Sequence, residues 1–146
     1  MKYWDMMKRE PSRMVIDTSA ILAILLGEPE AELYAKAIAD DSKRLMSAFS
    51  ALETGIVIEA KKGEAGGREW DILLHRAAID LIPFTPDQCT LAREAWRKYG
   101  KTRHPAGLNI GDCCFYALAK FSGQTLLFKG NDFNKTDLKT LFFQQL

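Results

Sequence analysis

The sequence predicts an α/β fold of three layers, in which helices cover both faces of a central, mainly parallel sheet of about five strands. Short apolar runs of strand length alternate along the chain with longer segments of helical spacing. Such alternation is typical of parallel sheets buried on both faces. The chain has 146 residues, of which 47% are hydrophobic, and this suits one domain with a real core. We interpret residues 1–13 as a lead-in and 14–146 as a single domain.

The first strand is the apolar run M-V-I at 14–16, which stops at Asp17. Thr18 or Ser19 can cap the helix that follows, and Gly27 ends it near residue 26. Asp17 therefore lies where a strand stops and a helix starts. In an open α/β sheet this edge is where ligands bind.

The remaining elements follow from the same kinds of signal. Helices are expected to begin at a serine, a threonine, an asparagine or a proline, and strands are short and apolar. The expected strands are 43–48, 79–84, 125–128 and 138–143, and the expected helices are 28–39, 51–62, 69–78, 86–99 and 110–121, with a short helical turn after 132.

The segment 51–62 is ambiguous. It contains Gly55 and the β-branched run I-V-I, so propensity alone favours a strand. We favour a helix, because a strand would place Glu53 and Glu59 on the same face as Val57. The glycines at 63, 66 and 67 predict a loop after it.

Two tryptophans and one cysteine lie at helical spacing. The helix at 86–99 is expected to bury Cys89, Leu91, Ala92, Ala95 and Trp96. Trp70 is interpreted as core in the preceding helix.

Composition excludes several classes of protein. The net charge is +1, so nucleic-acid binding would need local basic patches or a bound cation. The three cysteines include no C-x-x-C pair, which argues against a disulfide framework and a zinc site and favours a reduced, cytoplasmic setting. The longest apolar run is too short to span a membrane, and no apolar signal region opens the chain.

Four carboxylates fall at strand ends or helix starts, namely Asp17, Glu53, Asp112 and Asp132. Because such ends meet at one edge of a parallel sheet, these side chains can converge there. Clustered carboxylates repel one another unless protons or a cation neutralise them. Oxygen ligands without nitrogen or sulfur favour Mg²⁺, or Mn²⁺, over Zn²⁺.

Each acid also has a purely structural interpretation, which for Asp17 is that of a turn or cap residue. Ser50 with Glu53, and Asn109 with Asp112, resemble capping boxes, in which the acid only satisfies the start of a helix. Asp132 follows glycine and asparagine and can be an ordinary turn residue. No single spacing here is a specific metal motif.

Taken together, four blocks of sequence resemble the PIN-domain ribonucleases, specifically the VapC toxins of bacterial toxin–antitoxin pairs. The blocks are V-I-D-T-S-A, S-A-L-E-T-G-I-V-I-E-A-K, L-N-I-G-D-C-C-F-Y-A-L-A-K and L-L-F-K-G-N-D-F-N-K-T-D. Their order, spacing and flanking residues agree with that family from about Met14 to Leu141. The phrase R-H-P-A-G-L-N-I-G-D is typical of one VapC subgroup.

The resemblance implies a PIN-like α/β/α sandwich with an acidic pocket. Position by position, the three core metal-binding acids match Asp17, Glu53 and Asp112, and the more variable fourth acid matches Asp132. Ser19 matches a serine expected to hydrogen-bond within the site. The implied activity is metal-dependent endoribonuclease cleavage of a transfer or ribosomal RNA. The implied partners are a VapB-type antitoxin and a second copy in a homodimer.

Other residues are assigned more weakly. Asn109 is a supporting helix cap, and Asp137 is a weaker candidate for the acidic cluster. Positive charge beside the acids can hold RNA phosphates, and the candidates are Lys101, Arg103, His104 and Lys129. A solvated loop is the alternative for this group, and His104 can instead be structural or a general acid.

Two further functions stay open beside the toxin. One is a PIN-type nuclease acting in RNA processing outside toxin–antitoxin systems. The other is a binding module that keeps the fold without catalysis, although four intact acids argue against it. A receiver domain of the flavodoxin type also gathers acids at a sheet edge. The late fourth acid and the lack of a receiver-type lysine and threonine arrangement disfavour it.

Overall fold

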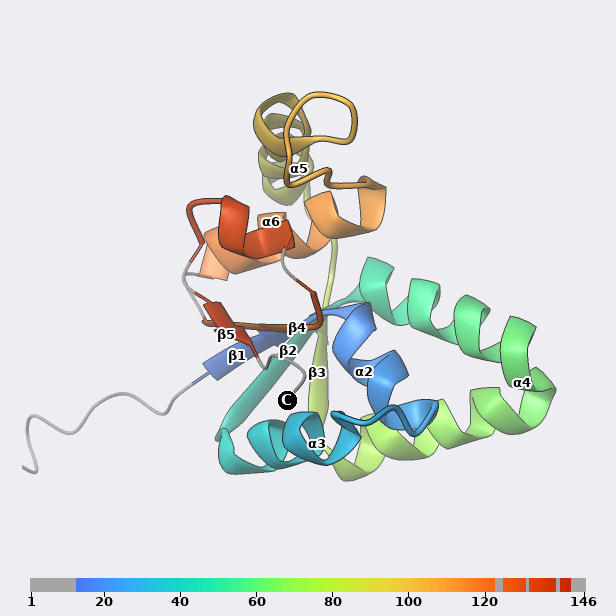
Figure 1. The fold of residues 1–146 in the computed structure, drawn as a ribbon. Coiled ribbons are helices and arrows are strands. Elements are labelled where there is room, and N and C mark those ends of the chain that lie inside the picture. Colours follow the sequence, from blue (N-terminus) through green and yellow to red (C-terminus); the bar gives the residue numbers. More distant parts are fainter. Residues whose placement is uncertain (1–12, 123–124, 131, 139, 143–146) are drawn as a thin grey trace, which may run out of the picture.

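The computed structural model describes residues 13–122, 125–130, 132–138 and 140–142 (Figure 1). Its elements, in chain order, are β1 Arg13–Ile16, α2 Thr18–Leu25, α3 Ala31–Asp40, β2 Lys43–Ser47, α4 Ala48–Arg76, β3 Ile79–Ile82, α5 Pro86–Tyr99, α6 Ile110–Ser122, β4 Thr125–Phe128, the 3-10 helix η1 Asp132–Lys135 and β5 Thr140–Phe142. The order of strands and helices is the predicted one. The lead-in lies outside the described residues except for Arg13, which begins β1.

The sheet has five strands in the order β3-β2-β1-β4-β5, and every neighbouring pair is parallel. The chain first builds outward from β1 through β2 to β3, and then crosses back to place β4 on the other side of β1. The direction of winding therefore reverses between β1 and β4. In α/β proteins, ligands bind at the carboxyl ends of the strands where the winding reverses. The parallel sheet confirms the predicted fold class.

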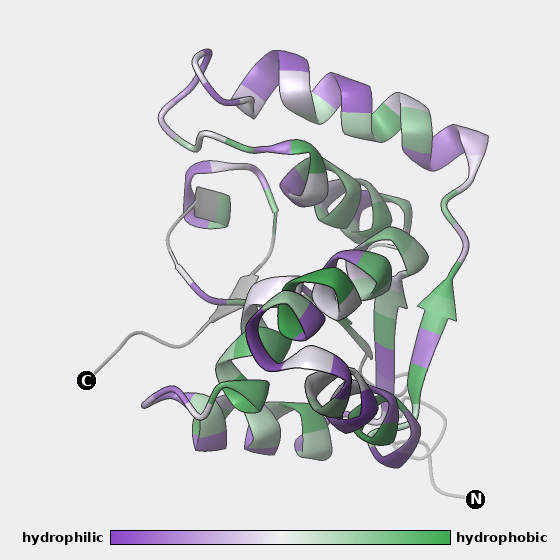
Figure 2. Ribbon diagram, turned by 90° about the vertical axis from the view of Figure 1, so that its right-hand side faces the viewer, coloured by the Kyte–Doolittle hydropathy of each residue, from purple (hydrophilic) through white to green (hydrophobic). Residues whose placement is uncertain are grey.

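Two helical layers cover the sheet, one on each face (Figure 1). Alternate residues of β1 point to opposite faces, as a strand requires. Val15 packs into the core under α5 and α6, whereas Met14 and Ile16 pack into the core under α2, α3 and α4. Figure 2 shows that the helices carry both hydrophobic and hydrophilic segments, as expected of helices with one buried face.

The cap of α2 is not Thr18 or Ser19 and agrees instead with the structural alternative for Asp17. Asp17 itself is the N-cap, in an extended conformation, and its side chain accepts a hydrogen bond from the backbone N–H of Ser19. Thr18, a predicted cap, is instead the first helical residue. At the other end Gly27 has a positive φ of 63°, a conformation that glycine adopts without strain, so its predicted role is confirmed.

The ambiguous segment is helical, as predicted, and the break predicted after it is present but shorter than the expected loop over 63–67. Helix α4 starts at Ala48 with Ser47 as its N-cap and continues to Arg76, with non-helical backbone only at Gly63. Gly66 serves a different purpose from a loop. A Cβ there would lie 2.9 Å from the carbonyl oxygen of Ile58, so the absent side chain lets the two halves of α4 approach closely.

The buried face of α5 agrees only in part with the prediction. Ala92 and Ala95 are buried, as predicted, but Cys89 is exposed, Trp96 is 42% exposed and Gln88 is buried. The buried positions keep the helical spacing of four and three residues, but the stripe lies one position before Cys89. Trp70 is buried, as predicted, and donates to the carbonyl oxygen of Ala51. Within the described ranges, no helix is both long and apolar enough to cross a bilayer.

Candidate acidic site

The first acid lies at the carboxyl end of the central strand β1. The backbone N–H of Asp17 donates to the carbonyl oxygen of Leu127 on β4, which fixes the residue at the point where the winding reverses. Asp17 Oδ2 accepts from the hydroxyl of Ser19 at 2.7 Å and from its backbone N–H at 3.2 Å. Ser19 Oγ in turn accepts from the backbone N–H of Lys129 at 2.9 Å. Ser19 thus links the carboxylate after β1 to the loop after β4.

The second acid reaches the same edge from α4. Glu53 Oε1 accepts a hydrogen bond of 2.9 Å from the hydroxyl of Thr18, which follows Asp17 directly. On its other side Glu53 lies against the first turn of α6, because a Cβ on Gly111 would sit only 2.5 Å from Glu53 Oε2. The capping box expected from Ser50 and Glu53 is absent, since α4 already begins at Ala48. The carboxylate of Glu53 is therefore directed toward α2 and α6.

The third acid does form the capping box that its spacing suggested. The N–H of Asp112 donates to Asn109 Oδ1 at 2.9 Å, and the N–H of Asn109 donates to Asp112 Oδ2 at 3.0 Å. These two bonds hold the carboxylate at the start of α6, where the helix dipole favours negative charge. Asp112 directly follows Gly111, and Glu53 lies against Gly111. The capping box therefore holds Asp112 in the turn of α6 that faces Glu53.

The charges of Asp112 and Glu53 both act on Asp17. The pKa of Asp17 is raised to about 7, chiefly by burial and also by these two charges, against the lowering effect of the bonds from Ser19. Burial also raises the pKa of Cys113 and Cys114 to about 11, with added contributions from Asp112 and Glu53 respectively. Both thiols therefore stay protonated at neutral pH and are poor nucleophiles.

The oxygen ligands suit a hard divalent cation, but the carboxylates whose positions the structure describes do not surround one common point. Asp17, Glu53 and Asp112 offer carboxylate oxygens, which Mg²⁺ and Mn²⁺ prefer. In the part of the chain that the structure describes, no three His, Cys, Asp or Glu side chains lie close enough to share one metal ion. Asp132 is the first residue of η1, as predicted for a short helical turn, but its side chain lies outside the described part.

The four predicted phosphate-binding residues have different surroundings. Lys101 is exposed and lines a pocket beside α6, and Arg103 places its guanidinium 4.1 Å from the ring centre of Trp96. His104 Nδ1 accepts from the N–H of Ala106, which is a local structural bond.

Lys129 forms ion pairs with Glu28 and Glu30, and these hydrogen bonds raise its pKa. Its ammonium group is therefore already engaged within the protein.

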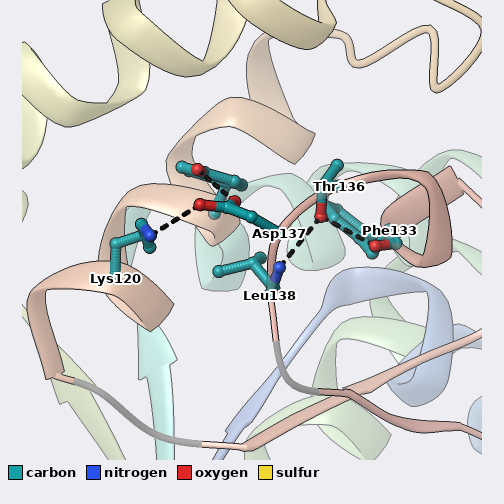
Figure 3. A network of polar contacts seen from close by, with 6 residues as sticks. Lys120, Phe133, Thr136, Asp137 and Leu138 are labelled. Atoms are coloured by element: carbon teal, nitrogen blue, oxygen red, sulfur yellow. Dashed lines mark hydrogen bonds and ion pairs between the residues drawn. The ribbon is translucent and has the colours of Figure 1, made fainter.

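Asp137, the weaker acidic candidate, lies alongside α6 (Figure 3). Its carboxylate accepts from the ammonium group of Lys120 at 2.7 Å and from the hydroxyl of Tyr116 at 2.6 Å. Burial acts to raise the pKa of Asp137, but these two hydrogen bonds outweigh it and lower the pKa. The structure thus gives Asp137 a role in attaching the segment after η1 to α6.

Two site residues were missed by reasoning from the sequence. Thr18 connects the acids, because its hydroxyl bonds Glu53 while its chain neighbour is Asp17. Gly111 leaves room for the Glu53 carboxylate. The sequence shows that Gly111 directly precedes Asp112. It does not show that Glu53 on α4 packs against this glycine.

Known proteins are similar to this chain in sequence and in fold. The family model of the PIN domain matches residues 14–139. The chain is 59% identical over 128 residues to Ribonuclease VapC30 of Mycobacterium tuberculosis, covering 88% of this chain and 98% of that one. It is 61% identical over 125 residues to Ribonuclease VapC of Mycolicibacterium smegmatis, covering 86% and 97%.

Among solved structures, VapC20 of M. tuberculosis, described as a Sarcin-Ricin loop cleaving toxin, superimposes with a TM-score of 0.71 at 16% identity, covering 86% of this chain and 95% of that one. VapBC2 from Rickettsia felis, bound to a promoter DNA fragment, gives 0.71 at 15% identity, covering 90% and 99%. At such identities the likeness shows the fold alone, whereas the family match and the two ribonucleases show the family. The chain belongs to the PIN-domain family and, within it, to the VapC ribonucleases of the VapBC toxin–antitoxin systems.

Proposed function

We propose that this chain is the toxin of a toxin–antitoxin pair and that it hydrolyses RNA phosphodiester bonds internally, with Mg²⁺ or Mn²⁺ held by its acidic residues. The observation that carries the proposal is the convergence of Asp17, Glu53 and Asp112 from three different helix starts onto one edge of the sheet. A buried carboxylate whose pKa is raised to about 7 by burial and by like charges is costly to the folded protein. A bound cation would remove that cost.

Three carboxylates would hold the ion, with Asp132 as a fourth. When bound, Mg²⁺ lowers the pKa of a water and stabilises negative charge on the phosphate. Ser19 orients Asp17 through two hydrogen bonds, and Asn109 orients Asp112 through the capping box. These bonds fix the oxygen ligands before the cation arrives, which reduces the cost of ordering them.

The acids also have a part in proton transfer. Asp112 or Asp132 is assigned to take the proton from the attacking water, because a carboxylate within one hydrogen bond of that water can act as a general base. The exposed cations Lys101 and Arg103 lie in the loop before Asn109 and are assigned to the RNA phosphates on either side of the cut.

The proposed partners follow from the family. The solved relatives include VapBC complexes from Rickettsia felis and from Haemophilus influenzae, which supports a VapB-type antitoxin for this chain. The described function of VapC20, cleavage of the Sarcin-Ricin loop, supports a structured RNA, either ribosomal or transfer RNA, as the substrate class. A homodimer is proposed on the same family grounds.

The test is cleavage of a total small-RNA fraction by the purified chain, in Mg²⁺ and in excess EDTA, with the ends of the products sequenced. Asp17→Asn removes one charged ligand and preserves the shape of the side chain. Asp137→Asn is the matched control, because it makes the same chemical change in the Lys120 ion pair.

We expect cleavage in Mg²⁺ by the natural chain and by Asp137→Asn, and none in EDTA or with Asp17→Asn. Cleavage that survives both EDTA and Asp17→Asn would overturn the proposal. RNA binding without cleavage in Mg²⁺ or Mn²⁺ would favour a non-catalytic binding module.

A further inference from the structure

A pocket of about 540 Å³ opens beside the acidic site, between the start of α4, the helix α5 and the start of α6. This volume lies within the range of sites that take small organic groups. Its lining is mostly apolar and includes Phe49, Phe84, Trp96 and Ile110. Trp96 is 42% exposed and Ile110 is 72% exposed, so large apolar surfaces face solvent here.

The pocket adjoins the candidate catalytic edge directly. Asn109, which caps Asp112, is part of its wall, and so are Cys113 and Cys114, which follow Asp112 in α6. Phe49 belongs to the first turn of α4, one turn before Glu53. A group in this pocket would therefore lie next to the carboxylates, on the side of α5.

Positive charge surrounds the apolar lining. Arg93 and Lys101 are exposed and contribute to the wall, and Arg103 stacks on the ring of Trp96. Aromatic rings combined with guanidinium groups bind unpaired nucleobases by stacking, while the cations bind the phosphates beside them. A purely apolar partner would not need this charge.

Resting on the proposed function, we propose that this pocket receives one unstacked nucleobase of the RNA, next to the bond that is cut, and that Trp96 is the residue against which the base stacks. The pocket then helps to select the cleavage position. Single-stranded loops present such bases at low cost, because their bases are already free of pairing.

Cys89 provides a readout that does not depend on catalysis. It lines the pocket and is the exposed cysteine, whereas Cys113 and Cys114 are buried. Because both of those thiols are buried, iodoacetamide should modify Cys89 first. RNA in the pocket should shield this thiol.

The experiment measures the rate of Cys89 alkylation by mass spectrometry in the Asp17→Asn chain with Mg²⁺, as the small-RNA fraction is added. We expect RNA to slow the modification until it levels off. With Trp96→Ala added, the RNA concentration for half protection should rise about 5- to 150-fold, the effect of losing one stacked base. Trp96→Phe should restore most of the protection.

Phe121→Ala is the matched control, because Phe121 is an exposed aromatic residue at the other end of α6 and does not line the pocket. It should leave the protection unchanged. In the active chain, Trp96→Ala should redistribute the cut sites found by sequencing, and Phe121→Ala should not.

Alkylation of Cys89 at one rate with and without RNA would overturn the pocket proposal. So would protection that needs no RNA and disappears on dilution, because a second copy of the chain would then fill the pocket. If Mg²⁺-dependent cleavage is normal while Trp96→Ala changes neither protection nor cut sites, the pocket proposal fails and the nuclease stands. If nothing is cut but RNA still protects Cys89, the nuclease proposal fails and the pocket stands.

Discussion

Replacing Asp17 by asparagine should stabilise the metal-free protein at neutral and alkaline pH. The pKa of Asp17 is raised from 3.8 to about 7, mainly by burial and then by Asp112 and Glu53. Well below pH 3.8 the carboxyl is protonated in both the folded and the unfolded chain, so it has no effect on stability. As pH rises toward 7, the unfolded chain releases this proton while the folded chain keeps it. The free energy of unfolding therefore falls.

The magnitude follows from the two pKa values. The difference between 3.8 and about 7 corresponds to roughly 4 kcal/mol of destabilisation at pH 8. Asparagine removes this destabilisation. It also weakens the hydrogen bonds from Ser19, which costs about 1–2 kcal/mol. We expect a net gain of about 2–3 kcal/mol, or roughly 5–10 °C in Tm for a chain of this length.

The assay is thermal unfolding in EDTA from pH 4 to pH 8, followed by circular dichroism. The gain of Asp17→Asn should be smallest at pH 4 and largest at pH 8. Asp137→Asn is the control of opposite sign, because the pKa of Asp137 is lowered by Lys120 and Tyr116. It should cost about 1 kcal/mol or less at pH 7, since the pair is partly exposed, and less at pH 4. Equal Tm values for Asp17→Asn and the natural chain across this range would refute the reasoning.

Three more predictions follow from the same contacts. Gly111→Ala places a Cβ 2.5 Å from Glu53 Oε2, so the flexible carboxylate must move. The Tm in EDTA should change little, while the rise in Tm on adding Mg²⁺ should become smaller. An undiminished Mg²⁺ response would contradict this placement of Glu53. Asn109→Ala removes a helix cap and should cost about 1 kcal/mol in urea unfolding, and no loss would argue against the capping box. Iodoacetamide should modify Cys89 well before Cys113 in the folded chain; mass spectrometry showing equal rates would contradict the burial of Cys113.

Local sequence signals predicted most of the fold. The apolar run 14–16, the helix start at 86 and Gly27 each act within a few residues, and the structure places them as expected. The break at Gly63 was predicted, but it is shorter than the expected loop, because Gly66 lets the two halves of α4 approach closely, and this is a tertiary contact. Local patterns do not contain such contacts.

The acidic edge was predictable for the same reason that the fold was. Parallel strands end together, so Asp17 after β1 and the acids at the starts of α4 and α6 were expected to approach one another. The sequence did not show which side chains form hydrogen bonds or ion pairs with each other. The ion pairs of Lys129 with Glu28 and Glu30 join parts of the chain about a hundred residues apart. The exposure of Trp96 depends on how α5 is rotated against α6, which composition does not specify.

The most direct test of the central claim is to locate the cation. Crystals of the chain grown or soaked with Mn²⁺ would show the ion by its anomalous X-ray scattering. We expect a peak within coordination distance of carboxylate oxygens of Asp17, Glu53 and Asp112, and the ion would draw these side chains closer together than they lie here. A peak at other residues, or no peak at a Mn²⁺ concentration that supports RNA cleavage, would contradict it.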